Sequence, residues 1–289
     1  MHTHCQPADS WTRSPPSRRL WRSERLSQTH AEHCATSPAA PDRPAARSLC
    51  DGFPSAIRRR ARGMVEGKVA VALVFTANAR RLGIVSAVGT VSLGILYDFT
   101  LVAGLLSLQS PQQPIGDPLF SILEILIILM MPLLVTLIVA IHAWATAETK
   151  VFSVVALVFV TLLAGVTCGV HFVILTVGRQ AAFAESSWMP LLLSFKWPSV
   201  FYALDILAWD VFFALSVLFA APVFSGNRLA RCIRMLMIAS GVLALAGLSG
   251  VIVGDMQWRN IGIAGYGGAF PVAAALLVIL FYRATPREA

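Results

Sequence analysis

Six long apolar segments, separated by short polar breaks, dominate this chain from residue 82 onward. Each meets the requirement of roughly 17–25 residues for a helix that crosses the hydrocarbon core of a bilayer. Since that core holds no water, every backbone N–H and C=O has to be bonded within the segment, which a helix achieves. The sequence therefore predicts an all-α fold, a polytopic membrane helical bundle with six transmembrane helices, at residues 83–108, 119–143, 151–177, 200–224, 230–253 and 262–282.

The composition excludes most other classes of protein. Hydrophobic residues make up 56% of the chain and charged residues 13%, against about 25% charged residues in soluble domains. The net charge of +8 does not indicate a nucleic-acid-binding surface, because residues 1–81 hold fourteen Lys and Arg against six Asp and Glu, while residues 82–289 hold nine of each. The five cysteines form no regularly spaced set of the kind that a disulfide framework needs. The expected partner is the lipid bilayer, and no nucleic acid is expected.

Residues 1–63 are rich in Arg, Ser and Pro and have no apolar period. Because such a composition cannot offset the entropy of ordering, we expect a disordered basic tail. The composition changes at once after Met64. We therefore favour the hypothesis that the natural chain starts at Met64 and that residues 1–63 come from an over-extended reading frame; a tail that binds anionic lipid or nucleic acid through its arginines is the alternative. Residues 64–82 are predicted as a cytoplasmic lead-in and residues 284–289 as a cytoplasmic tail.

The basic residues beside the predicted spans indicate an orientation. Short cytoplasmic loops carry the excess of Lys and Arg. One set of flanks holds nine such residues, which are Lys68, Arg80, Arg81, Lys150, Arg228, Arg231, Arg234, Arg283 and Arg287. The other set holds three, which are Arg179, Lys196 and Arg259. This bias predicts a multi-pass protein of the cell membrane with both termini in the cytoplasm.

Glycine, proline and aromatic residues give predictions about packing. Two GxxxG spacings, Gly165–Gly169 and Gly250–Gly254, predict places where helix backbones approach closely. Pro132 and Pro271 fall within predicted spans, where a missing N–H is expected to kink the helix. Tyr202 lies near the end of a span and is predicted to be an interfacial aromatic residue.

Ionisable residues inside the predicted spans are the most informative feature of the sequence. A charged side chain near the middle of a span costs about 2.5–3.5 kcal/mol, so each one requires a structural or functional reason. The candidates for a cavity, a ligand site or a proton pathway are Asp98, Glu124, His171, Asp205 and Asp210, with Asp255 at an outer helix end. At about 1.5 Å of rise per residue, Asp98 lies roughly 15 Å inside its span, and Glu124, His171 and Asp205 lie roughly 8–9 Å inside theirs. All six are predicted in the outer half of the membrane.

Two of these residues are predicted to point in different directions. Asp205 and Asp210 are five residues apart, which corresponds to about 140° around an α-helix. The sequence therefore predicts that only one of them faces a central cavity and that the other pairs with a neighbouring helix or lies in a second crevice.

The sequence predicts no catalytic residue, no cofactor and no metal site. Cys168 and His171 lie three residues apart on one helical face, which makes them weak candidates for metal ligands, because a metal site needs three or four converging ligands. No GxSxG turn is present, and Cys168 has only His171 as an evident base. These features do not favour an enzyme.

Several short stretches carry a resemblance to known proteins. They are Arg81–Ile84, Gly94–Asp98, Tyr202–Asp210, Leu215–Phe219 and Ala220–Phe224. In these stretches the chain resembles a group of uncharacterised bacterial six-span integral membrane proteins, over roughly residues 80–285. The resemblance implies the architecture of a bacterial inner-membrane protein and assigns no activity. His171 stands where a Tyr or Asn is expected in that group.

The favoured function is the handling of a small solute, an ion or a proton through an outward-facing acidic cavity in which Asp98, Glu124 and Asp205 meet. One alternative is a structural or regulatory membrane subunit without transport, in which hydrogen-bonded carboxyls fix the packing. A less favoured alternative is an intramembrane hydrolase or transferase. The two halves of the chain show no convincing internal repeat, which counts against a transporter.

Overall fold

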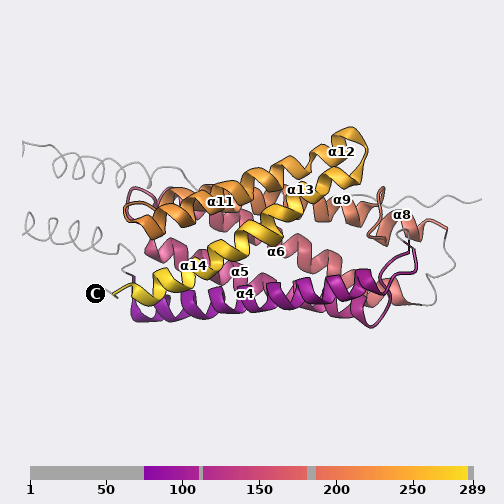
Figure 1. Cartoon of the computed structure of the whole chain (residues 1–289), viewed down its shortest axis with the longest axis horizontal. Coiled ribbons are helices and arrows are strands. Elements are labelled where there is room, and N and C mark those ends of the chain that lie inside the picture. Colours follow the sequence, from indigo (N-terminus) through magenta and orange to yellow (C-terminus); the bar gives the residue numbers. More distant parts are fainter. Residues whose placement is uncertain (1–74, 111–112, 181–186, 286–289) are drawn as a thin grey trace, which may run out of the picture. The chain divides into compact units, whose positions relative to one another are not determined.

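A computed structural model describes residues 75–110, 113–180 and 187–285 (Figure 1). The predicted tail of residues 1–63, most of the lead-in and residues 286–289 lie outside the described residues. Within the described ranges all regular secondary structure is helical, and six helices are long and apolar enough to cross a membrane. The predicted fold class is confirmed to that extent.

The first three of these long helices are nearly continuous. They are α4 (Ala77–Leu106), α5 (Leu119–Trp144) and α6 (Lys150–Thr176), which η1 (Val177–Arg179) prolongs. A short helix, α8 (Met189–Leu193), precedes the fourth span.

The other three spans are built from several pieces. The fourth span consists of α9 (Val200–Ile206), the π-helical η2 (Leu207–Phe213), α10 (Ala214–Ala220) and η3 (Ala221–Val223). The fifth consists of α11 (Arg228–Gly247) and α12 (Ser249–Val253). The sixth consists of η4 (Met256–Arg259), α13 (Asn260–Ile263), the π-helical η5 (Ala264–Ala269) and α14 (Phe270–Arg283).

Side-chain caps explain why two spans begin earlier than predicted. The first span begins at Ala77 rather than at residue 83, because the Thr76 hydroxyl accepts a hydrogen bond from the backbone N–H of Ala79. The sixth begins at Met256 rather than at residue 262, because Asp255 accepts one from the N–H of Gln257. Thr and Asp are preferred N-cap residues for this reason. The predicted lead-in therefore ends in helix.

Packing along the chain follows the order of the helices. α5 packs between α4 and α6, α14 packs on α4, and α10 packs between α6 and α11. The largest fully buried side chains include Met131, Leu137, Ile141, Leu163, Phe213, Phe224, Ile233, Met237, Leu277 and Phe281. Outward-facing apolar side chains such as Phe99 and Ile252 are 71% and 84% exposed, which is compatible with a lipid-facing surface.

The predicted close packing at the GxxxG spacings is wrong for α6. A Cβ atom added to Gly165 or Gly169 would meet nothing within 4 Å, because both glycines lie on the exposed side of α6, opposite its buried residues. Gly254 also faces open space and ends α12 in the left-handed conformation, with a φ of 78°.

The two prolines differ in their surroundings. Pro132 lies within an unbroken α5, whereas Pro271 is the second residue of α14, which follows the π-helical η5. A proline removes one backbone hydrogen bond and its ring crowds the carbonyl four residues earlier. A local widening of the helix before Pro271 relieves that crowding.

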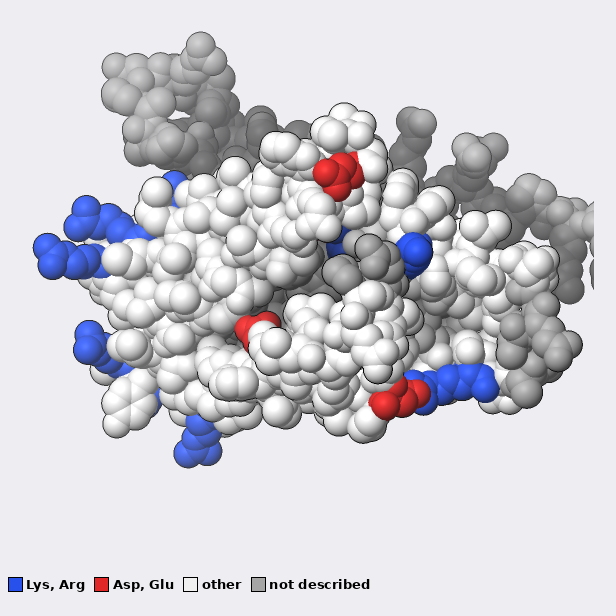
Figure 2. All heavy atoms as spheres, turned by 45° about the vertical axis from the view of Figure 1, so that its right-hand side comes forward, with Lys and Arg blue, Asp and Glu red and all other residues white. Residues whose placement is uncertain are grey.

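Basic side chains gather at one end of the bundle. Figure 2 shows the largest group of Lys and Arg at its left-hand end and a surface beyond it that carries few charges. Arg80, near the start of α4, donates from Nε to the carbonyl oxygen of Phe281 (3.0 Å) and from Nη2 to that of Tyr282 (2.6 Å). The start of α4 therefore lies beside the end of α14 (Figure 1). Lys150 and Arg228, at the first positions of α6 and α11, belong to this same end.

Candidate functional site

A cavity of about 420 Å³ lies among the helices and is the main candidate site. It extends from loop residues Pro114, Ile115 and Phe195, at the end opposite to the basic one, to Thr90 and Leu134 near the middle of α4 and α5. Four of the six candidate residues line it together: Asp98, Glu124, His171 and Asp205. The structure thus brings Asp98, Glu124 and Asp205 to one cavity from three different spans.

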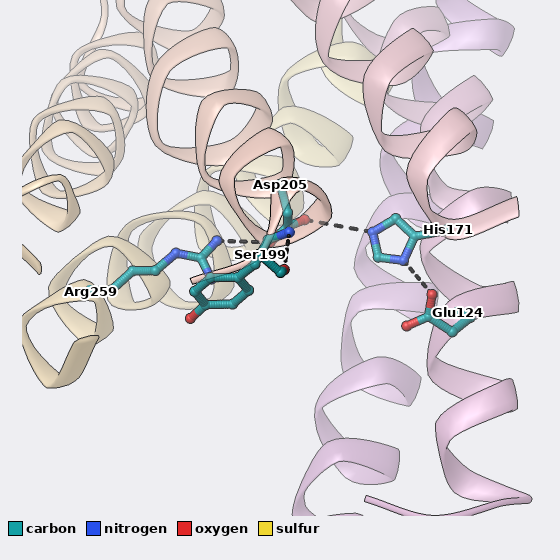
Figure 3. A network of polar contacts seen from close by, with 6 residues as sticks. Glu124, His171, Ser199, Asp205 and Arg259 are labelled. Carbon is teal, nitrogen blue, oxygen red and sulfur yellow. Dashed lines mark hydrogen bonds and ion pairs between the residues drawn. The ribbon is translucent and has the colours of Figure 1, made fainter. Parts of the chain in front are cut away.

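His171 lies between two carboxyl groups (Figure 3). Its Nδ1 is 2.7 Å from Glu124 Oε2, and its Nε2 is 3.6 Å from Asp205 Oδ1. The first distance is a hydrogen bond, whereas the second is too long for one. All three side chains are buried, at 4% exposure for Glu124 and His171 and 8% for Asp205. An ionised carboxylate only accepts, so Nδ1 carries a proton whenever Glu124 is charged.

Arg259 continues this chain of charges on the other side of Asp205. Its Nη2 donates to Asp205 Oδ2 (2.8 Å) and its Nε donates to Asp210 Oδ2 (3.1 Å). Its guanidinium carbon also lies 4.7 Å from the centre of the Tyr202 ring, within the range of a cation–π contact. Buried arginine is stable when it is paired and hydrogen-bonded in this way.

One prediction about these residues is wrong. Arg259 was expected in an outer loop, but it is only 6% exposed and lies within the sixth span. Tyr202, predicted to be an interfacial aromatic residue, lies near the start of the fourth span and lines the cavity against Arg259. Sequence reasoning missed Arg259 because it placed the start of this span at residue 262. The signal that reveals it is Asp255, a good N-cap residue four positions earlier.

The prediction that only one of Asp205 and Asp210 faces the cavity is confirmed, because Asp205 lines it and Asp210, which pairs with Arg259 of the sixth span, does not. The two carboxyl groups do not point apart, however. Both carboxyls bind Arg259. The α-helical spacing of about 140° does not apply, because the π-helical η2 begins two residues after Asp205 and contains Asp210. In a π-turn residues that are five apart lie on one face.

Asp210 is held outside the cavity in a notch made by two glycines. It is 0% exposed and does not line the cavity. A Cβ added to Gly262 would lie 2.6 Å from Asp210 Oδ1, and one added to Gly247 would lie 3.1 Å from it. Only glycine leaves room for the carboxyl where these two backbones meet. Among the described residues, Asp210 Oδ1 has no hydrogen-bond partner.

The other two candidates are exposed. Asp98 lines the cavity and, within the described ranges, forms no hydrogen bond or ion pair. Asp255 lies away from the cavity, where it caps η4 through its 3.0 Å bond from Gln257 N. Asp255 therefore has a structural explanation, whereas Asp98 has none from its contacts.

Aromatic side chains form much of the remaining cavity wall. Trp209 and Tyr266 have ring centres 5.1 Å apart, and Phe195 lies 5.1 Å from the His171 ring. Tyr97 and Tyr202 line the cavity as well. Within the part of the chain that the structure describes, His171 Nε2 and Trp209 Nε1 are buried without a hydrogen-bond partner.

The weak metal candidates are not brought together with further ligands. Both ring nitrogens of His171 face carboxyl oxygens, and the half-buried Cys168 does not line the cavity. No group of three or more His, Cys, Asp or Glu in the described residues is arranged to hold a metal ion.

A second polar cluster lies at the same end of the bundle but outside the cavity. Arg179 Nη2 donates to Asp117 Oδ1 (3.0 Å) and to the Ser121 hydroxyl (2.7 Å), and that hydroxyl also bonds Asp117. The hydrogen bonds from Ser121 and Arg179 lower the pKa of Asp117. This exposed cluster joins the end of α6 to the start of α5.

Comparison of the chain with protein-family models, with curated proteins and with solved structures finds no match. The resemblance to uncharacterised bacterial six-span proteins stays a prediction.

Proposed function

We propose that this chain is a multi-pass protein of the cell membrane that admits a small cationic solute, in exchange with a proton, to its acidic cavity from the non-cytoplasmic side. The observation that carries the proposal is the row of ionisable side chains Glu124, His171, Asp205 and Arg259, which come from four spans and border one cavity. An intramembrane ionisable residue is costly and is typically functional.

The balance of charge favours a cation. Four carboxyl groups lie in or beside the cavity, on Asp98, Glu124, Asp205 and Asp210. Opposite them stand Arg259 and the titratable His171. Even with a protonated imidazole the carboxylates are in excess, and Asp98 has no cationic partner among the described residues. A positively charged ligand restores neutrality.

The cavity wall suits an organic cation. Tyrosine and tryptophan rings attract ammonium groups through their electron-rich faces, and Tyr97, Tyr202, Trp209 and Tyr266 line the cavity. Its remaining wall is mostly apolar, with Leu101, Ile127 and other aliphatic side chains. A volume of about 420 Å³ lies within the range of small-molecule sites.

His171 supplies a group through which a proton can compete with such a ligand. Its ring bridges Glu124 and Asp205, and protonation of the imidazole neutralises part of their charge. A cation in the cavity and a proton on His171 therefore oppose one another electrostatically.

The basic end of the bundle indicates how the protein is oriented in the membrane. Arg80, Lys150, Arg228 and Arg283 lie at helix ends on one side, and cytoplasmic flanks are the basic ones. Arg259 is buried among carboxylates and does not count as a flanking residue. Among the described residues, the exposed basic residues at the opposite end are then Arg179 and Lys196. The cavity extends toward that less basic side.

The test uses a single cysteine at Gly94, a cavity-lining position where an added Cβ meets nothing within 4 Å. In a background without native cysteines, we expect Gly94→Cys to react with a membrane-impermeant thiol reagent from outside the cell. Benzyltrimethylammonium should protect it, whereas benzenesulfonate should not. Gly116→Cys, which also faces open space but lies in an exposed loop outside the cavity lining, is the matched control: it should react from outside and show no protection.

Two results would overturn the proposal. One is reaction at position 94 only from the cytoplasmic side. The other is equal protection by the cation and the anion, since the charge of the cavity would then not select the ligand.

A further inference from the structure

A second hollow lies at the basic end of the bundle, away from the acidic cavity. It has a volume of about 380 Å³ and is formed where α11 begins and α14 ends. Two arginines from different helices line it, Arg228 and Arg283, together with Trp144, Asn227, Leu229 and Leu280.

The two guanidinium groups have no partner in the part of the chain that the structure describes. Within the described residues neither Arg228 nor Arg283 forms an ion pair or a side-chain hydrogen bond. By contrast, Arg179 is paired with Asp117, and Arg259 is paired with two aspartates. Two guanidinium groups at one hollow, neither paired within the described ranges, suit a phosphate, because their planar N–H forks match its oxygens.

The backbone at this hollow also favours an anion. Asn227 caps α11 by accepting a hydrogen bond from Ala230 N (2.8 Å), which leaves the N–H groups of Arg228 and Leu229 without acceptors inside the helix. The positive end of the helix dipole adds to the charge of Arg228. The carbonyl oxygens of Phe281 and Tyr282, near the end of α14, accept hydrogen bonds from Arg80, which offsets their repulsion of an anion.

The apolar part of the hollow indicates where the phosphate comes from. Leu229 and Leu280 line it beside Trp144, at the ends of spans, where tryptophan marks the depth of lipid head groups. Basic pockets between spans on the cytoplasmic side bind anionic head groups. We propose that this hollow binds the phosphate group of an anionic phospholipid, with free phosphate as the other source of the same chemistry.

The test measures lipid binding to the purified full chain by native mass spectrometry in a neutral detergent. Phosphatidylglycerol should bind at least tenfold more tightly than phosphatidylcholine. R228Q/R283Q should weaken the binding of phosphatidylglycerol by at least tenfold, since each basic residue contributes to the attraction. R231Q/R234Q is the matched control: it also removes two positive charges from the basic end, both from α11, but leaves the lining of the hollow intact. Its effect should stay within about threefold.

Further arms separate the remaining outcomes. R228K/R283K keeps the charge but not the planar N–H forks, so it should bind phosphatidylglycerol more tightly than R228Q/R283Q and more weakly than the wild type. It also serves as the test variant if R228Q/R283Q fails to fold. Displacement of phosphatidylglycerol by millimolar inorganic phosphate would identify free phosphate as a ligand, whereas no displacement would identify the lipid head group. Equal losses in R228Q/R283Q and R231Q/R234Q would overturn the proposal, because binding would then depend on the charge of the whole end.

Discussion

The carboxyl groups of Asp205 and Asp210 bind the same guanidinium group although five residues separate them in sequence. Arg259 thereby joins the fourth span to the sixth at two points, through its Nε and its Nη2. Both carboxylates and the guanidinium are buried, so each charge depends on the other two for compensation.

Removal of Arg259 should therefore destabilise the protein strongly. Arg259→Gln leaves two buried carboxylates without a cation, which costs about 3–5 kcal/mol. The measurement is the free energy of unfolding in mild detergent. Arg179→Gln is the control, because its ion pair with Asp117 is exposed and should contribute about 0–1 kcal/mol. Losses of equal size in the two variants would contradict the prediction.

Gly262→Ala should also be destabilising, because its Cβ would lie 2.6 Å from Asp210 Oδ1. The carboxyl group would have to move and so weaken its bond to Arg259, at a cost of about 1–3 kcal/mol. Gly169→Ala is the matched control, because Gly169 also lies in a helix but an added Cβ would meet nothing within 4 Å. This substitution should leave the free energy of unfolding unchanged or raise it by up to about 1 kcal/mol. Unfolding midpoints of the two variants measure the difference, and a stable Gly262→Ala variant would show that the notch is not needed.

The contribution of Asp117 to stability should depend on pH. Since the hydrogen bonds of Ser121 and Arg179 lower the pKa of Asp117 in the folded protein, this stabilisation is present above the pKa of a free aspartate, about 3.9. It is lost as the pH falls through the lowered value. The difference in stability between the wild type and Asp117→Asn should therefore be constant at neutral pH and should vanish in acid. A difference that does not shrink as the pH is lowered from neutral into the acid range would contradict the prediction.

The number of spans and their approximate positions could be predicted from the sequence, because the length of an apolar helix is fixed by the thickness of the membrane. The shared cavity of Asp98, Glu124 and Asp205 could also be anticipated, since residues at similar depth on different spans must face protein or water rather than lipid. The depth calculation needs only the rise of a helix, which is nearly constant.

The central ion chain could not be predicted, because it depends on two local departures from a regular α-helix. The π-turn in η2 places Asp205 and Asp210 on one face, and no single residue in that stretch signals it. The cap at Asp255 moves the start of the sixth span so that Arg259 falls inside. Because the predicted start of the sixth span was six residues too late, Arg259 was expected in a solvated loop, whereas it is the central cation of the site.

The orientation has a direct test. A reporter fused after Arg287, outside the described residues, should report the cytoplasm, and one inserted between Gln112 and Gln113 should report the opposite side. The reason is the excess of Lys and Arg at one end of the bundle. The reverse pattern would place the acidic cavity on the cytoplasmic side and would remove the basis for uptake from outside.

Glu124→Gln separates the charge of the cavity from its fold. A glutamine oxygen can still accept the hydrogen bond from His171 Nδ1, so the packing of α5 on α6 should persist and the unfolding midpoint should change little. The negative charge is lost, however, and at an effective dielectric constant of about 20 a charge about 8 Å from a bound cation contributes about 2 kcal/mol. Benzyltrimethylammonium should therefore protect a cysteine at position 94 with an affinity that is about 30-fold weaker.

Glu148→Gln, in the loop that joins α5 to α6 at the basic end, removes the same charge far from the cavity and should leave the affinity unchanged. If the Glu124→Gln variant folds and binds the cation as tightly as the wild type, Glu124 does not interact with the ligand, and its bond to His171 serves only to hold α5 and α6 together.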